Sequence, residues 1–393
     1  MTTTGSAREV FFAFLKLGLT SFGGPVAHLG YFRSELIERR RWMSDASYAD
    51  LIALCQFLPG PASSQVGFAL GLQRAGLAGG LLAWLAFTLP SALLLIGFAS
   101  IAELFSGALG QSAIHGLKLT AVAVVAHAVW GMAGSLCPDR KRAGIALLAL
   151  AITALASSAL SLIGAILIGA VLGLQLCRDV PRPQTPPLEL GFSQRIGLLC
   201  LGVFGGLLVG LPLAASVVPH HAVQLLDAVY RAGALVFGGG HVVLPLLQTS
   251  VVEPGWVSTD AFMAGYGAAQ AIPGPLFTFA AYLGFVDAGF GGAVLALLGI
   301  FLPGILILLA ALPLWNRLRA LPGAYALMAG TNAAVVGILA ATLYHPVWTS
   351  AVQRPQDLVI AATGFVLLGA FKWPAWAVVL ACLAGSVASP LLV

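Results

Sequence analysis

Charged side chains are scarce in this sequence. Only 8% of its 393 residues are Asp, Glu, Lys or Arg, whereas 59% are hydrophobic. A water-soluble domain carries about 25% charged residues, so the scarcity excludes a soluble globule. Apolar runs such as residues 79–102 reach the length of about 20 residues that crosses a bilayer. The composition therefore predicts an all-α polytopic membrane protein.

Residues that build catalytic or metal centres are scarce as well. The five cysteines have no metal-like spacing, which favours free thiols. The expected spans hold few acidic residues near their middle, and the sequence lacks the His-Glu-x-x-His motif of zinc metalloproteases. We therefore expect no enzyme, no metal and no cofactor. The net charge of +5 comes mainly from short loops, which indicates membrane orientation rather than nucleic-acid binding.

The sequence does contain an internal repeat. Phe22-Gly23-Gly24 returns as Phe237-Gly238-Gly239, and QFLPGP at 56–61 returns as QAIPGP at 270–275. Further matched pairs are Lys16 and Arg231, Ser64 and Thr278, Leu89-Pro90 and Leu302-Pro303, and Gly116 and Gly330. The offset stays between 213 and 215 residues throughout, which indicates a duplicated gene.

The repeat divides the chain into three parts. We expect an N-terminal repeat over residues 8–177, a linker with one unpaired transmembrane helix over 178–221, and a C-terminal repeat over 222–393. One extra crossing between two equal halves inverts the second half, provided that each half crosses the membrane an even number of times. Inverted repeats with broken helices are a common way to build a secondary transporter.

The number of crossings depends on the interrupted segments. If the Phe-Gly-Gly and Pro-Gly-Pro segments are re-entrant, about nine full spans remain; if they cross fully, there are about thirteen. The nine are 77–102, 111–135, 143–158, 160–177, 195–218, 290–314, 325–348, 356–371 and 374–391. The positive-inside rule favours the smaller number, because only Arg354 among the loop cations then lies on the opposite side. Both models predict a cytoplasmic N-terminus and a periplasmic C-terminus.

Glycine and proline interrupt the apolar runs at four matched places. In a membrane, non-helical backbone is tolerated only where it lines a cavity or is buried in protein. The amino end of a broken helix exposes N–H groups, carries about half a positive charge and attracts anions. We therefore expect the four breaks to face one another near the midplane, around an anion. The alternative, that they are packing notches or kinks, stays open.

Candidate substrate-binding residues come from both halves. Two matched cations suit a dianion, and the hydroxyls and amides near the breaks can donate hydrogen bonds. The first half contributes Lys16, Gly23, Gly24, Pro25, Gln56, Pro59, Gly60, Pro61 and Ser64. The second half contributes Arg231, Gly238, Gly239, Gly240, His241, Gln270, Pro273, Gly274, Pro275 and Thr278. Secondary candidates are His28, Lys118 and Asn332.

Each of these assignments has a structural alternative. The cations could extend to a membrane interface, the glutamines could join helices, and the histidines could be buried without a role in transport. The basic arm at 33–41 is interpreted as an interfacial helix that Trp42 anchors to the membrane.

The same motifs carry a family resemblance. FLKLGLTSFGGP, ERRRWMS and the Gln-x-x-Pro-Gly-Pro block, followed by FGGGH and QAIPGP, resemble the chromate ion transporter family in its long, two-domain form. The resemblance covers nearly the whole chain, apart from the linker and the unpaired span. The second half departs from the first, with Gly240 where the first has Pro25.

The resemblance implies a function. It implies a secondary active transporter that exports chromate, a tetrahedral oxyanion, across the bacterial inner membrane and confers chromate resistance. A carrier that takes up or exchanges sulfate or another anion is the alternative. The expected partners are the oxyanion and the lipid bilayer, with no nucleic acid, and the oligomeric state is left open.

Overall fold

A computed structural model describes the protein at residues 5–101, 107–156, 159–179, 192–237, 240–318, 321 and 323–389. Within these ranges the secondary structure is helical, without a strand, which confirms the all-α fold class. Among the described residues, five helices are long and apolar enough to cross a membrane: Ala62–Ile101, Leu109–Leu136, Gln194–Val217, Leu276–Leu314 and Ala324–Ala351. These agree with the expected polytopic membrane protein.

The first half contains seven α-helices and one π-helix in its described residues. They are α1 (Ala7–Thr20), α2 (Gly24–Phe32), the π-helix η1 (Arg33–Arg39), α3 (Asp45–Phe57), α4 (Ala62–Ile101), α5 (Ala108–Leu136), α6 (Arg140–Leu155) and α7 (Ala159–Leu176). The helix without a counterpart, α8 (Gln194–Val217), packs on α9 and α12. Most of the linker, residues 180–191, lies outside the described ranges.

The second half follows the same order with more short pieces. It contains α9 (His221–Ala234), η3 (Gly240–Val242), α10 (Val243–Leu247), η4 (Gln248–Val252), α11 (Thr259–Ala271), η5 (Leu276–Thr278) and α12 (Phe279–Ala311). After these come η6 (Leu312–Leu314), α13 (Trp315–Leu318), α14 (Ala324–Thr342), η7 (Leu343–Trp348), α15 (Thr349–Ala351), α16 (Pro355–Gly369) and α17 (Ala375–Ala388). Each of the nine expected spans coincides with a helix in its described part; whether all of them cross the membrane stays a prediction.

Helix α4 folds back on itself near its first third. Ala75 (φ −142°, ψ 28°) and Gly76 (φ 67°, ψ −162°) leave the helical region. A Cβ on Gly71 would collide with the backbone of Gly79, although residues eight apart in a straight helix are about 12 Å apart. The two pieces therefore lie against each other, and the second one begins where the sequence predicts the span at 77–102.

Helix α12 repeats this bend in the second half. Ala288 (φ −140°, ψ 28°) and Gly289 (φ 63°, ψ −156°) adopt nearly the same backbone angles. Gly284 and Gly292 approach each other as closely as their counterparts in α4 do. Glycine is needed at the second bend position because its positive φ is costly for a residue with a Cβ.

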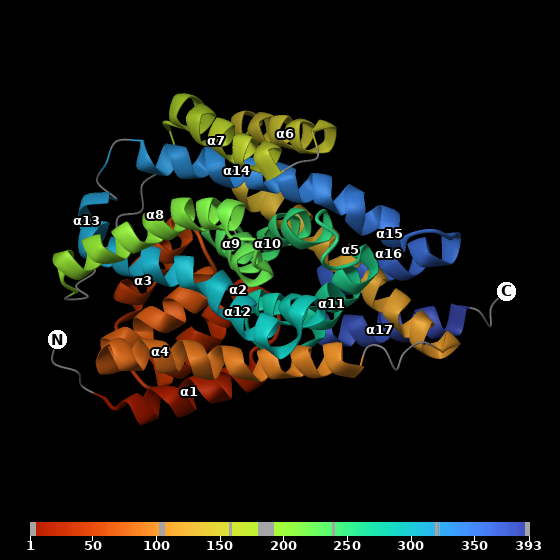
Figure 1. Ribbon diagram of the computed structural model, residues 1–393, viewed down its shortest axis with the longest axis horizontal. Helices are drawn as coiled ribbons and strands as arrows, with labels where there is room; N and C mark the ends of the chain where they lie inside the picture. The colour runs from red at the N-terminus through yellow and green to blue at the C-terminus, as the bar shows by residue number, and fades with distance from the viewer. Residues whose placement is uncertain are drawn as a thin grey trace.

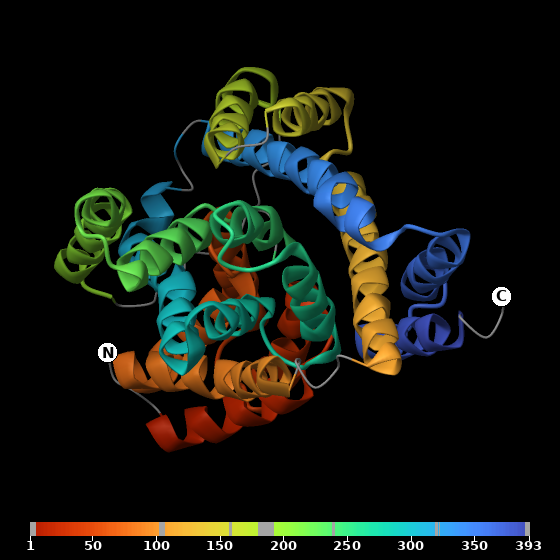
Figure 2. The same ribbon diagram turned by 45° about the vertical axis from the view of Figure 1, so that its right-hand side comes forward.

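The long helices α5 and α14 are each packed by the last two helices of the other half. Helix α14 packs against α6 and α7, and α5 packs against α16 and α17. Figures 1 and 2 both show α6 and α7 lying along α14, with the blue C-terminal helices beside α5. The contacts are close, since Gly116 meets Leu383 and Gly330 meets Gly169 with no room for a Cβ. The two halves are therefore interlocked.

A pair of an acidic and a basic side chain attaches the first helix of each half to its bent helix. In the first half Glu9 of α1 accepts from Arg74 of α4 at 3.1 Å. The indole of Trp42 donates to Glu9 at 3.2 Å, and the Arg74 guanidinium lies 5.5 Å from a Trp42 ring. Trp42 is only 8% exposed, so the expectation that it anchors the arm to the membrane interface is wrong.

The second half places different side chains at the equivalent corner. His221 of α9 is bonded to Asp287 of α12 at 2.6 Å. The ring of Trp256, the counterpart of Trp42, meets His221 edge to face at 4.8 Å. The acid and the basic side chain have exchanged helices relative to the first half, which preserves the attachment.

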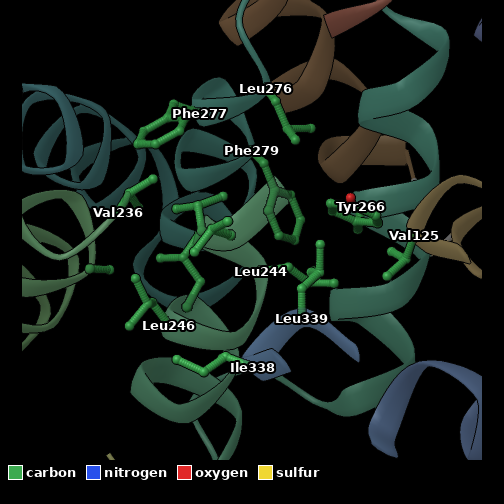
Figure 3. Close-up of a cluster of buried hydrophobic side chains, with 14 of the residues drawn as sticks. Val125, Val236, Leu244, Leu246, Tyr266, Leu276, Phe277, Phe279, Ile338 and Leu339 are labelled. Carbon is green, nitrogen blue, oxygen red and sulfur yellow. The ribbon is translucent and has the colours of Figure 1, made fainter. Parts of the chain in front are cut away.

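A buried apolar cluster surrounds the interrupted segments of the second half. Figure 3 shows Val236, which precedes the second Phe-Gly-Gly, in one cluster with Leu276 and Phe277, which follow the second Pro-Gly-Pro. Leu244 of α10 and Leu339 of α14 belong to the same cluster. Burial of each of these side chains stabilises the fold by about 1.5–3 kcal/mol, which fixes the described residues that precede and follow the breaks.

Candidate functional site

The first break lies between α1 and α2. The backbone N–H of Ser21 donates to the Leu17 carbonyl at 2.8 Å and ends α1. Gly23 (φ 100°) and Gly24 (φ 81°) then adopt left-handed conformations that favour glycine. Pro25 stands at the start of α2, where its missing N–H costs no helical hydrogen bond. The sequence thus produces the break locally.

The two Pro-Gly-Pro segments form a second pair of breaks. Gly60 (φ 118°) and Gly274 (φ 112°) have the same backbone conformation. In each half an extended residue, Leu58 or Ile272, ends the preceding helix two positions before the glycine. The proline after the glycine directly precedes the next helix. The first N–H groups of α4 and η5 therefore lie directly at the breaks. No preceding helical turn supplies carbonyl groups to accept their hydrogen bonds.

The breaks of one half are hydrogen-bonded to those of the other. The Gly60 N–H donates to the Val236 carbonyl at 2.7 Å, and the Gly274 N–H donates to the Ser21 carbonyl at 3.0 Å. Both bonds join a Pro-Gly-Pro glycine to the residue that precedes the opposite Phe-Gly-Gly. The two contacts are equivalent under the repeat, so they relate the halves by an approximate two-fold arrangement at this point.

Further contacts bring the remaining break residues to the same place. A Cβ on Gly240 would lie 3.1 Å from the Pro25 ring, so the start of η3 lies beside the start of α2. A Cβ on Gly60 would lie 3.0 Å from the Gly304 Cα, just after Pro303, and one on Gly274 would meet Ser91, just after Pro90. The described break residues are therefore gathered at one position; the candidates Gly238 and Gly239 lie outside the described residues.

Several buried polar atoms at this position have no hydrogen-bond partner among the residues that the structure describes. They are the hydroxyls of Ser21, Ser64 and Thr88 and the Nε2 atom of His28. His28 lies near the Ser63 hydroxyl, 3.4 Å from its Nδ1, and its ring meets Phe87 at 5.3 Å. Because an unsatisfied buried polar group is costly, these groups indicate a place that a polar ligand can fill.

The matched hydroxyls of the two halves are not equivalent. The Thr278 hydroxyl donates to the Pro275 carbonyl at 2.7 Å, within its own turn. Ser64 makes no such bond within the described ranges, although only 5% of it is exposed. The free donor is therefore on the first-half side of the site.

The candidate glutamines also differ from each other. Gln56 is exposed at the end of α3, whereas the side-chain nitrogen of Gln270 is buried and lacks a partner in the described structure. Gln65, which the sequence did not single out, donates to the carbonyls of Pro59 and Gly304, both at 2.9 Å. It joins the two halves beside Gly60.

The candidate cations Lys16 and Arg231 are held in ion pairs. Lys16 donates to Glu35 at 2.8 Å, and Arg231 makes two bonds to Asp227, at 2.9 and 2.7 Å. Their side chains are 53% and 38% exposed. The structure thus pairs both cations with acids; their part in binding stays a prediction.

Glu35 forms ion pairs with cations of the basic arm. Besides Lys16, it accepts from Arg39 and Arg40 at 2.9 Å. Burial raises the pKa of Glu35, but hydrogen bonds from the three cations outweigh burial and lower the pKa to about 2. The carboxylate is therefore charged at neutral pH, and the stability it contributes is lost only as the pH falls below about 4 toward 2.

The remaining candidates are His241, Lys118 and Asn332. His241 is bonded to the Tyr266 hydroxyl at 2.7 Å, next to the second Phe-Gly-Gly. Lys118 of α5 is bonded to Asp260 of α11, and Asn332 is half-buried on α14. Sequence reasoning missed Ser21, Thr88 and Gln65, because none of them is matched by a polar residue in the other half.

Comparison with known proteins identifies relatives along nearly the whole chain. The family model described as chromate transporter matches residues 8–174 and 223–387. The chromate transport protein of Pseudomonas aeruginosa is 30% identical over 388 residues, which cover 93% of this chain and 87% of the relative. The chromate transport protein of Cupriavidus metallidurans is 30% identical over 396 residues, covering 99% and 95%.

A shorter relative matches a single part of the chain. The uncharacterized transporter YwrA of Bacillus subtilis is 29% identical over 180 residues, which cover 44% of this chain and 99% of that protein. No solved structure matches the chain.

Proposed function

We propose, because the chain belongs to the chromate transporter family, that it is a secondary transporter that exports chromate across the bacterial inner membrane. The relatives from Pseudomonas aeruginosa and Cupriavidus metallidurans are chromate transport proteins. Chromate is a tetrahedral dianion, and no covalent chemistry is needed to move it. Binding, release and a driving force are sufficient, so the proposal assigns no catalytic residue.

The observation that carries the proposal is the meeting of the four breaks. Two helices start just after Pro61 and Pro275. The glycine before each of these prolines donates the hydrogen bond that joins the halves. Helix amino ends attract anions through free N–H groups and their partial positive charge. The unpartnered hydroxyls of Ser21 and Ser64 supply donors beside them. Such donors suit an oxyanion.

Lys16 and Arg231 have a conditional part in this proposal. Each is bound to a carboxylate, so each adds charge to the site only if that ion pair opens during transport. We propose that the breaks and the buried donors hold the anion in the closed site. The cations would then attract it while one side of the protein is open.

Transport would follow from alternating access. In this proposal the cross-half bonds at Gly60 and Gly274 would separate when the parts of the protein on either side of the breaks rock against each other. The membrane potential contributes about 2.3 kcal/mol per charge per 100 mV, and it drives an anion out of a negative cytoplasm. Export of a dianion is therefore favoured without a chemical fuel.

The test is accumulation of radiolabelled chromate in inside-out vesicles that contain the protein. Energised vesicles should accumulate chromate, and an uncoupler should prevent this. Excess sulfate should compete, because helix ends recognise charge and shape. Vesicles that accumulate sulfate but never chromate would contradict chromate export and support the alternative carrier.

Variants connect the activity to the site. Loss of one hydrogen bond to a charged ligand costs about 1.5–3 kcal/mol, so Ser64→Ala should weaken apparent chromate affinity roughly 10- to 100-fold. The control is Ser100→Ala on the same helix, because the Ser100 hydroxyl is exposed and bonds only to its own helix at Ile96. Equal transport by both variants would remove Ser64 from the site.

A further inference from the structure

A second polar cavity lies away from the four breaks. Its volume is about 940 Å³, and it is bordered by the starts of α5, α11 and α16. Phe98 of α4 and Tyr282 of α12 form part of its wall and stack on each other at 5.9 Å. Helix α11 runs from this cavity, at Asp260, to the break at Pro273, about 20 Å away at 1.5 Å per residue.

The cavity lies at three helix amino ends. Its lining includes residues 111–118 from the first turns of α5, 260–264 from the start of α11, and 353–357 from the start of α16. Each helix start carries a partial positive charge of about half a unit. The last turns of α4 and α17 border the cavity as well, and their carboxyl ends carry partial negative charges. Three amino ends against two carboxyl ends leave the helices with a small positive contribution to the potential of the cavity.

Two cations add to this potential. The Lys118 side chain is only 11% exposed and is bonded to Asp260, which is 72% exposed at the mouth. The Arg354 side chain is exposed. No carboxylate of the described residues forms an ion pair with it. His115 supplies a third basic group in the same lining.

The two acids of the described lining are already engaged. Asp357 accepts from His115 at 2.8 Å and from the backbone N–H groups of Gln353 and Arg354 at 3.1 and 2.9 Å. Asp260 is occupied by Lys118. After these bonds, the guanidinium of Arg354 and the remaining protons of Lys118 are donors without a carboxylate of their own. The two acids balance the two cations in formal charge, but Arg354 is left without a carboxylate partner among the described residues, which favours an anion over a cation.

The size of the cavity indicates how an anion is held. At about 30 Å³ per water molecule, 940 Å³ has room for roughly 30 waters. A single small oxyanion would therefore keep much of its hydration there. Such binding is weak and reversible, as an entry or exit chamber requires.

We propose that this cavity is a second anion site, a vestibule in which Lys118 and Arg354 hold a hydrated tetrahedral dianion on its way to or from the breaks. The identity of that dianion rests on the proposed function. On the predicted topology Arg354 faces the periplasm, which puts the vestibule on the exit side.

The test measures protection of a cysteine in the cavity. Gln353→Cys, in a Cys137→Ser background, is labelled in the purified full-length protein with an anionic thiol reagent. Sulfate replaces chromate as the probe because chromate oxidises thiols. We expect sulfate to slow labelling severalfold more than sodium chloride of equal ionic strength does. Labelling of Ser135→Cys, on the exposed end of α5, should show no such difference.

Two charge variants complete the test. Arg354→Gln and Lys118→Gln should each remove the protection by sulfate, while Lys141→Gln, which removes an exposed cation on α6, should keep it. Because Lys118 is buried and its variant could fail to fold, the exposed Arg354 variant decides. Protection that survives Arg354→Gln, or that never occurs, overturns the vestibule.

The outcome is separate from that of the proposed function. Sulfate protection in a protein that transports no chromate would retain the vestibule and contradict chromate export. Chromate transport without protection at residue 353 would retain export and overturn the vestibule.

Discussion

At the scale of single residues, glycine decides where this chain can break. Gly60 and Gly274 hold φ values of 118° and 112°, in a region that residues with a Cβ avoid. Both also lie where the opposite half approaches, at Gly304 and Ser91 respectively. The same positions thus meet two requirements, an unusual backbone conformation and a close contact.

A first prediction follows for Gly60→Ala. The substitution should lower the free energy of unfolding by about 1–3 kcal/mol, because it adds backbone strain and places a Cβ 3.0 Å from the Gly304 Cα. Thermal unfolding in detergent measures the effect. The control is Gly131→Ala in α5, which has no atom within 4 Å of the new Cβ and should be neutral or stabilising, by up to about 1 kcal/mol. Equal melting temperatures for both variants would contradict the assigned backbone.

At the scale of elements, bent helices and corner ion pairs recur in both halves. The bends of α4 and α12 have matching backbone angles. The corner pairs, Glu9 with Arg74 and His221 with Asp287, attach the first helix of each half to the bent helix. The acid lies on the first helix in one half and on the bent helix in the other. The packing of the two helices is therefore retained although the side chains that join them differ.

A second prediction concerns the corner of the first half. Glu9→Gln and Arg74→Gln should each loosen α1 from α4, and together they should cost less than the sum of the single effects. The expected coupling is about 1 kcal/mol, the upper range for partly exposed pairs. A double-mutant cycle of unfolding free energies in detergent measures it. The same cycle on the exposed pair Lys141 and Asp179 should give almost no coupling; similar values at both places would argue against a structural role for the corner.

At the scale of the whole molecule, the halves are interlocked. Helix α5 relies on α16 and α17, and α14 relies on α6 and α7. The Pro-Gly-Pro glycine of each half also donates to the backbone of the other. Neither half therefore completes its packing or its site by itself.

A third prediction tests this interlocking by dividing the chain between residues 180 and 190. Each fragment expressed separately should be degraded or aggregate, because the faces around Gly116 and Gly330 lose their partners. Co-expressed fragments should copurify and recover chromate uptake in inside-out vesicles. Gly116→Leu in the co-expressed pair should prevent copurification, whereas Gly134→Leu, at an uncrowded position on the same helix, should not. A stable, active single half would contradict the prediction.

Part of the site could be read from the sequence, for local reasons. The positions of the breaks follow from Gly23-Gly24-Pro25 and from the two Pro-Gly-Pro motifs, because glycine and proline restrict or permit backbone angles wherever they occur. The span starts at residues 77 and 290 were also predicted closely. Lys16 and Arg231 were expected to face a common centre, but their ion-pair partners, Glu35 and Asp227, depend on side-chain positions that spacing does not determine.

The sequence by itself determined that the protein lies in a membrane, that its fold is all-α and where its helices break. These depend on composition and on local backbone preferences, which every short segment carries within itself. Only the tertiary structure decided that Gly60 meets Val236 and that Gly274 meets Ser21, that the Ser64 hydroxyl is left free while that of Thr278 is used, and that Lys118 and Arg354 border one cavity. These facts depend on distances between atoms that are far apart along the chain, and such distances are set by the packing of all the helices together.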